Sequence, residues 1–149
     1  MGKSTKGHSQ DTRKRTSTAV NSSDSRCPIW LFDRIDKKGA FAFDINAPYF
    51  DHKDFLSKMI EYSSMTWAEI KKQTHDMDKS KHHYLVYSAL SKDARDRIDD
   101  LNMFDLTDAI FSFAFNNTLR IIGFRDNEYF HVVWYDRNHQ FCPSKLKHT

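Results

Sequence analysis

The stretch from Asp108 to Phe141 most constrains how this chain can fold. It reads DAIFSFAFNNTLRIIGFRDNEYFHVVWYDRNHQF and holds three runs of β-branched and aromatic residues, separated by Asn-Asn and by Asp-Asn. Asn and Asp tolerate the positive φ angles of tight turns, so runs punctuated in this way predict three consecutive antiparallel strands. Most of the large apolar side chains of the chain lie here, and we expect them to build the core.

The length and composition predict one globular domain. The chain has 149 residues, of which 39% are hydrophobic and 14% aromatic, enough to bury a substantial core. No apolar run is long enough to span a bilayer, and no apolar segment follows the N-terminus as a Sec signal peptide would require. We therefore expect Cys27 and Cys142 to be reduced thiols of a cytoplasmic protein.

The positive charge of the chain is unevenly distributed. Residues 1–26 carry six Lys and Arg against two Asp and Glu, with ten Ser and Thr and no aromatic residue. This composition predicts a disordered basic tail, which either contacts nucleic acid or a partner, or only keeps the chain in solution. Residues 27–149 are then the folded domain. Within it, residues 117–149 carry five basic against three acidic residues, so its last third is locally basic.

Capping residues mark the expected helices between the tail and the strands. Asp51 is the N-cap of a helix that should end near Ser63, and Thr66 and Glu69 have the capping-box spacing at the start of a short helix. Residues 71–83 are polar and predict a loop. A third helix is capped by Ser91, and its apolar face consists of Ala94, Ile98 and Leu101.

The order of elements predicts an α+β fold. Residues 28–35 and 40–43 read as two short strands joined by a turn, which predicts an N-terminal hairpin. Helices that precede the sheet in the chain predict that they pack on one face of the antiparallel meander. Strand alternation makes Phe130, Val132 and Trp134 the core face and leaves His131 and Tyr135 on the open face.

The sequence lacks the common motifs for nucleotide, hydrolase and metal chemistry. It has only four glycines, no phosphate-binding Gly loop, and no GxSxG, HExxH or CxxC, so we expect no cofactor and no metal. What remains is a set of Arg, His, Tyr and Lys residues on and near the meander. Cleavage of a ribose phosphodiester needs a base, an acid and cations for the charged transition state, and these residue types supply all three.

Six residues are the expected catalytic groups. We expect Arg120 and Arg125 to stabilise phosphate charge, although an Arg or His on a solvated sheet face is often only surface. Strict alternation places these two arginines on opposite faces, unless a bulge near Gly123 turns one of them round. The expected acid–base residues are His131, Tyr135, His139 and His83, and the expected RNA contacts are Lys81, His82, Lys145 and Lys147.

The C-terminal strands resemble the C-terminal hairpin of the RelE/ParE-like toxins. The resemblance covers about the last 60 residues, through Leu119–Phe124, an Asp-Asn turn, Phe130–Trp134 and His139-Gln140-Phe141. It implies a toxin that cleaves mRNA, in some members on the ribosome, and that a cognate antitoxin holds inactive. It carries a functional arginine over to Arg120 and a His-aromatic pair to His139 and Phe141, where nuclease members often have Tyr.

Two other functions remain open. Some members of this fold group inhibit a protein target without cutting RNA, and Phe141 in place of Tyr favours such a binding role. In that case Tyr129, Tyr135 and Phe141 would be exposed anchors of a protein interface. A nucleic-acid-binding accessory role, based on the basic tail, is the third hypothesis.

Overall fold

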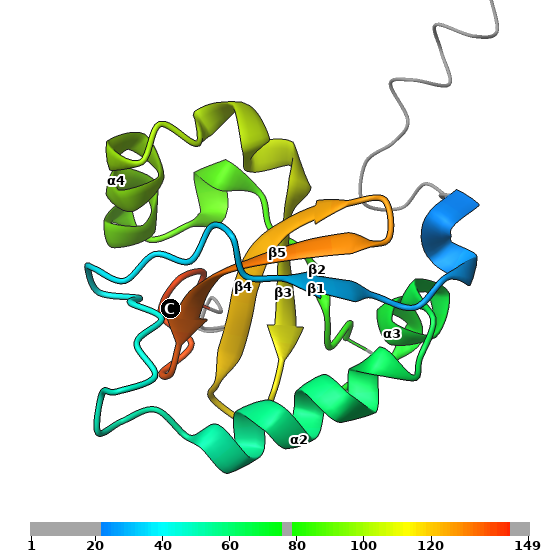
Figure 1. Cartoon of the computed structure of the whole chain (residues 1–149). Coiled ribbons are helices and arrows are strands. Elements are labelled where there is room, and N and C mark those ends of the chain that lie inside the picture. Colours follow the sequence, from blue (N-terminus) through cyan, green and yellow to red (C-terminus); the bar gives the residue numbers. More distant parts are fainter. Residues whose placement is uncertain (1–21, 76–78, 144–149) are drawn as a thin grey trace, which may run out of the picture.

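A computed structural model of the chain describes residues 22–75 and 79–143. It has an α+β fold, in which helices surround a single five-stranded sheet (Figure 1). In chain order the elements are η1 (Ser22–Ser25), β1 (Ile29–Leu31), α2 (His52–Ser63), α3 (Trp67–Lys72), β2 (His83–Tyr84), η3 (Tyr87–Ala89), α4 (Lys92–Asp100), η4 (Phe104–Ala109), β3 (Ile110–Ala114), β4 (Arg120–Asp126) and β5 (Tyr129–Asp136). None of these helices is long and apolar enough to cross a membrane.

The sheet has the order β1-β5-β4-β3-β2 and mixes two strand directions. The predicted antiparallel run of β3, β4 and β5 is confirmed. The predicted N-terminal hairpin is wrong, because β1 instead pairs parallel to β5, with Ile29 opposite Tyr129. Residues 36–43 form no second strand. They continue along the edge of β5 that β1 occupies. Asp36 N donates to Val133 O and Tyr135 N donates to Phe41 O, each at 3.0 Å.

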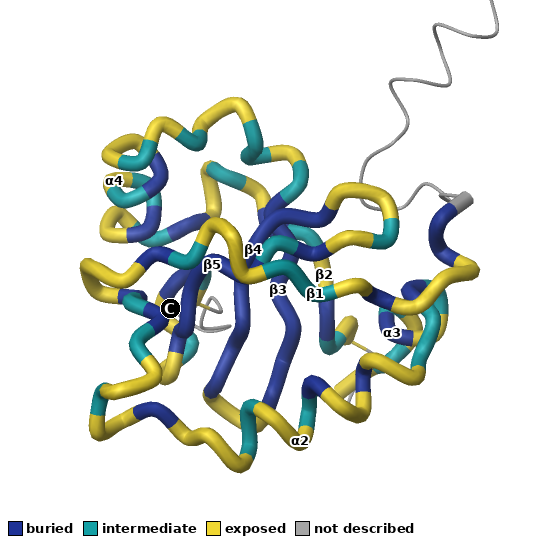
Figure 2. Tube along the Cα trace, viewed as in Figure 1, coloured by how far each residue is buried: buried dark blue, intermediate teal, exposed yellow. Residues whose placement is uncertain are grey.

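Helices cover both faces of the sheet, so the prediction of helices on one face is wrong. On one face α2 and α3 pack against the strands through Tyr62, Trp67 and Ile70. On the opposite face α4 packs through Ala94 and Ile98 (Figure 1). The physical reason lies in the strands, because all five residues of β3 are buried (Figure 2). A sheet with one solvated face would instead alternate apolar and polar residues.

A bulge in β5 changes which residues share a face. Ile122 pairs with Trp134, whereas the next residue, Gly123, pairs with Val132, so Val133 is the extra residue. A side-chain carbon at Gly123 would lie 1.9 Å from the His131 carbonyl oxygen, which explains why this position lacks one. As a result Trp134 faces the α4 side and Tyr135 the α2 side, and the expected common face for Phe130, Val132 and Trp134 is wrong.

The predicted helix starts are confirmed by their capping bonds. The Asp51 carboxylate accepts from Asp54 N at 2.9 Å, and Ser91 Oγ accepts from Ala94 N at 3.2 Å. Thr66 and Glu69 form the complete capping box at the start of α3. These bonds join residues three apart, so the local sequence alone determines them. Cys27 and Cys142 are both free thiols.

Candidate functional site

Arg125 is a structural residue rather than one presented to a ligand. Its side chain is 1% exposed, and Nη2 donates to Asp24 Oδ1 at 2.6 Å and to Ser23 Oγ at 3.1 Å. The guanidinium also lies 4.1 Å from the centre of the Trp67 ring. Burial alone would raise the pKa of Asp24, but hydrogen bonds from Lys71 and Arg125 outweigh it and lower that pKa. Arg125 therefore ties the start of the domain to β4 and α3.

Tyr135 also has a structural position. It is buried on the α2 side, where its ring stacks on Phe50 at a centroid distance of 4.4 Å. Its hydroxyl oxygen accepts at 2.9 Å from the backbone N–H of Asp51, the N-cap residue of α2. Burial raises the pKa of Tyr135, which makes it a poorer proton donor. Burial thus removes this residue from the predicted open face.

His131 lies at the end of β5 that is farther from the C-terminal turn. Its Nδ1 is 2.7 Å from Asp33 Oδ1, which links β5 to the segment after β1. In the strand ladder His131 pairs with Phe124, whereas Arg120 pairs with Asp136 at the opposite end. The structure therefore does not bring His131 together with Arg120.

Arg120 lies on the other face of β4 from Arg125, as strict alternation predicts. The bulge lies in β5 and leaves the alternation of β4 unchanged. Arg120 Nη1 donates to the carbonyl oxygens of Asn116, Asn117 and Leu119, at 2.9, 3.4 and 3.1 Å. Within the described residues, no other atom of the Arg120 side chain forms a hydrogen bond. The turn between β3 and β4 thus holds this cation at one end of the sheet.

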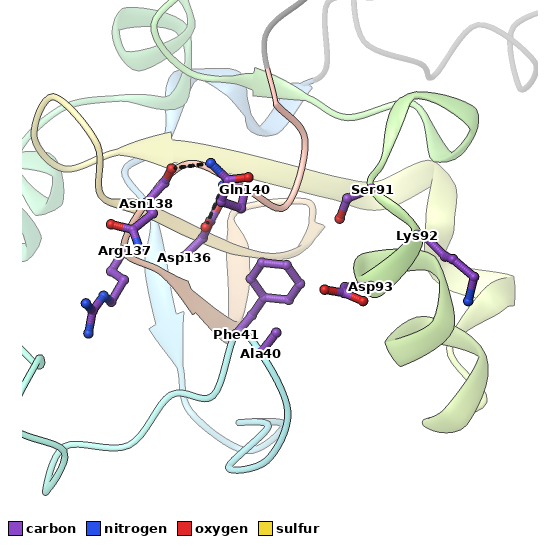
Figure 3. Close-up of a pocket in the computed structure, with 9 residues that line it drawn as sticks. All are labelled: Ala40, Phe41, Ser91, Lys92, Asp93, Asp136, Arg137, Asn138 and Gln140. Atoms are coloured by element: carbon purple, nitrogen blue, oxygen red, sulfur yellow. Dashed lines mark hydrogen bonds between the residues drawn. The ribbon is translucent and has the colours of Figure 1, made fainter.

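His139 lies in a turn that the end of β5 holds rigidly. The Asp136 carboxylate accepts from Gln140 N at 2.8 Å (Figure 3). It also accepts from Phe141 N at 2.9 Å. The Phe141 ring is buried against Phe41 and Trp134, at centroid distances of 4.9 and 4.8 Å. With both ends held, His139 adopts φ 56°, a left-handed conformation that is uncommon for residues other than glycine.

His139 lies within range of the charges of two other expected catalytic residues, Arg120 and His83. Burial lowers the pKa of His139, and the positive charges of Arg120, His83 and His75 lower it further. His139 is therefore neutral over more of the physiological pH range than an ordinary histidine, and its free nitrogen can accept a proton. We call the set His83, Arg120 and His139 the His139 patch. Strand β3 separates His83 from Arg120. Its residue Ser112 pairs with His83 of β2, and its residue Ala114 pairs with Arg120 of β4.

His82, which precedes β2, and His83, the first residue of β2, point in different directions. His83 is exposed and lies opposite Ser112, on the same side of the sheet as Arg120. His82 is buried, where its Nδ1 accepts from Ala114 N at 3.0 Å and its Nε2 lies 2.8 Å from Gln73 Oε1. Burial, with smaller contributions from nearby charges, lowers the pKa of His82 to about 3. His82 therefore has a structural position, away from the exposed surface where we expected it to contact RNA.

Other expected site residues have different outcomes. Lys81 lies close enough to His82 for its charge to lower the pKa of that residue. Lys145 and Lys147 lie outside the described residues. His75 was not expected at the site, although it follows two lysines and a Gln-Thr pair in the polar stretch 71–83. Its charge acts on His139 only because residues 73–75 lie antiparallel to residues 79–81, with His75 N bonded to Lys79 O at 2.8 Å.

The aromatic residues expected to anchor a protein interface are mostly buried. Phe141 and Tyr135 belong to the two cores, and only Tyr129 is exposed, at 39%. Phe141 therefore positions His139 from within the core. The exposed apolar residues include Leu56 and Ile60, one turn apart on α2, with exposed fractions of 59% and 64%.

A pocket of about 390 Å³ lies on the α4 side of the same turn. Its charged residues do not converge, because Arg137 and Lys92 point away from one another (Figure 3). Across residues 22–75 and 79–143, no three His, Cys, Asp or Glu side chains form a group that could hold a metal ion. The pocket is lined by Ala40, Phe41, Ser91, Lys92, Asp93, Asp136, Arg137, Asn138 and Gln140.

No protein-family model matches this chain, and comparisons with curated proteins and with solved structures likewise give no match.

Proposed function

We propose that this chain is a metal-independent endoribonuclease whose active site is the His139 patch. The observation that carries the proposal is the histidine with a lowered pKa, held in a left-handed turn within range of the charges of Arg120 and His83. A general base, a second imidazole and a fixed cation are the groups that cleavage of a ribose phosphodiester requires.

The three residues have distinct roles in the proposed reaction. Neutral His139 takes the proton of a ribose 2′-hydroxyl, whose oxygen then attacks the adjacent phosphorus. The bond from phosphorus to the 5′-oxygen breaks, and protonated His83 donates a proton to that leaving oxygen. Arg120 stabilises the additional negative charge on the phosphoryl oxygens in the transition state. The products are a 2′,3′-cyclic phosphate and a 5′-hydroxyl end, and no other reactant is consumed.

The biological role that we propose is that of a toxin in a bacterial toxin–antitoxin pair. It rests on the resemblance of residues 119–141 to the RelE/ParE-like toxins and on the position of Arg120 and His139 at one end of the sheet. The partners would be a cognate antitoxin and mRNA, free or on the ribosome, which implies action in the cytoplasm.

Purified protein incubated with labelled mRNA, with and without ribosomes, tests the nuclease proposal. We expect His139→Ala and Arg120→Ala to lower the cleavage rate by about 100-fold or more. His131→Ala is the matched control, because it removes a histidine of the same strand region outside the patch, and we expect cleavage near the wild-type rate. Cleavage by His139→Ala at the wild-type rate, or no cleavage by the wild type, would contradict the proposal.

A non-enzymatic inhibitor of a protein target is the second candidate. The observation that favours it is the pair of exposed apolar residues Leu56 and Ile60 on the outer side of α2. Growth inhibition on expression that survives in His139→Ala but is lost in the double variant Leu56→Ser, Ile60→Ser would support this candidate over the nuclease.

A further inference from the structure

A second pocket, of about 400 Å³, lies beside the His139 patch. It forms where α2 meets the turn between β3 and β4, which lie side by side in Figure 1. We call it the Lys81 pocket. It is lined by Asp54, Lys58, His75, Lys81, Phe115, Asn116 and Asn117.

The Lys81 pocket and the His139 patch share one turn. Arg120 Nη1 donates to the carbonyl oxygens of Asn116 and Asn117, two residues that line the pocket. His75, another lining residue, contributes to the lowered pKa of His139. Arg120 and His75 therefore link the pocket to the patch.

The charges of the pocket favour a phosphate-bearing ligand. Two lysines and His75 face a single carboxylate, that of Asp54, which already accepts from Asn116 Nδ2 at 3.1 Å. The Lys81 ammonium forms no ion pair with a described residue. Lys58 lies 3.3 Å from Glu61 at the surface, a contact that contributes little to stability and that a phosphate can replace. The balance is therefore positive.

The walls of the pocket are preorganised. Asn116 Oδ1 accepts from Thr118 N at 2.9 Å and from Leu119 N at 2.7 Å, which fixes the turn. On the other wall Lys81 N donates to Gln73 O at 2.9 Å, and buried His82 holds the Gln73 side chain. A site that is ordered before binding loses less conformational entropy when a ligand enters.

We infer that the Lys81 pocket binds one unpaired nucleotide of an RNA strand, next to the phosphate that the His139 patch cleaves, so that the substrate is single-stranded RNA. This inference rests on the proposed function. A volume of about 400 Å³ is within the range of small-ligand pockets. The bases of a duplex stay stacked and paired, whereas those of a single strand can turn out into a pocket.

Fluorescence anisotropy with a short fluorescein-labelled single-stranded RNA tests the inference. The protein carries His139→Ala so that the RNA stays intact, and the same RNA annealed to its complement is the comparison. We expect single strands to bind at least about tenfold more tightly than the duplex. Lys81→Ala and Lys58→Ala should each weaken single-strand binding about three- to tenfold and reduce the slope of log K against log salt by roughly 0.7.

Lys92→Ala is the matched control, because it removes the same charge from an exposed site on α4, and we expect unchanged affinity. Circular dichroism of each variant checks the fold. Equal affinity of the Lys81 and Lys58 variants and the control, or equal affinity for duplex and single strand, would overturn the inference. If the wild type does not cut RNA but the Lys81 and Lys58 variants bind it more weakly, only the nuclease proposal fails.

Discussion

The imidazole of His82 accepts the backbone N–H of Ala114 at 3.0 Å, and this bond requires an unprotonated Nδ1. It joins the residue before β2 to the end of β3, in the layer between Tyr62 and Phe113. His82, which must stay neutral to make this bond, therefore holds the edge of the sheet that carries Lys81 and His83.

Stability should fall in acid because of His82. The pKa of its side chain is about 3 in the folded chain and about 6.5 in the unfolded chain, so the unfolded state binds the proton first. The stabilisation is complete above pH 6.5 and is lost as the pH falls toward 3, by up to about 1.4 kcal/mol per pH unit. Urea unfolding at pH 7.5, 6 and 5 measures this slope.

His82→Asn is the comparison variant, because its amide oxygen can still accept from Ala114 N but does not titrate. We expect a lower free energy of unfolding at neutral pH and a shallower dependence on pH. An equal slope in wild type and variant would show that other groups cause the acid sensitivity.

The pH dependence of RNA cleavage should reflect His139. Its pKa is lowered by burial and by neighbouring positive charges, so kcat/KM should stay high below pH 6.5 and decline only at lower pH. His75→Gln removes one of these charges and should move the acid limb to higher pH. Cleavage rates measured from pH 4.5 to 8 test this, with His52→Gln on α2 as a control that should leave the limb in place.

Phe141→Tyr tests whether the position needs a hydroxyl, as the resemblance to nuclease toxins suggests. Phe141 is fully buried beside Phe41 and Trp134, so a hydroxyl there would lose its hydration without a ready partner. We expect a loss of about 1–3 kcal/mol in the free energy of unfolding and no gain in cleavage. Phe104→Tyr, at an exposed site, should be nearly neutral. A faster nuclease with unchanged stability would contradict the assigned core role.

Arg125→Ala should act on stability alone. Among the described residues, it leaves the Asp24 carboxylate with Lys71 as its only charged partner, and it exposes the face of Trp67. Breaking a buried pair in this way costs about 3–5 kcal/mol. Arg26→Ala removes an exposed arginine from its pair with Glu128 and should cost less than about 1 kcal/mol. Chemical denaturation of the two variants distinguishes these outcomes, and equal losses would contradict the structural role of Arg125.

Several features could be predicted because they depend on neighbours in the chain. The caps at Asp51, Thr66 and Ser91 use bonds to residues three positions on, and the antiparallel order of β3, β4 and β5 follows from short turns. Strict alternation also predicted correctly that Arg120 and Arg125 lie on opposite faces. The opposite directions of His82 and His83 follow from the same local geometry of an extended chain.

The remaining features depend on contacts between residues far apart in the sequence. Whether residues 28–35 pair with residues 40–43 or with β5 is decided by the free edge of β5. The bulge at Val133 reverses the faces of Trp134 and Tyr135. The sequence by itself determined the helices, three strands and the chemistry available. Only the tertiary structure decided which arginine lies with His83 and His139. The local sequence does not distinguish Arg120 from Arg125 in this respect, whereas burial and long-range packing do.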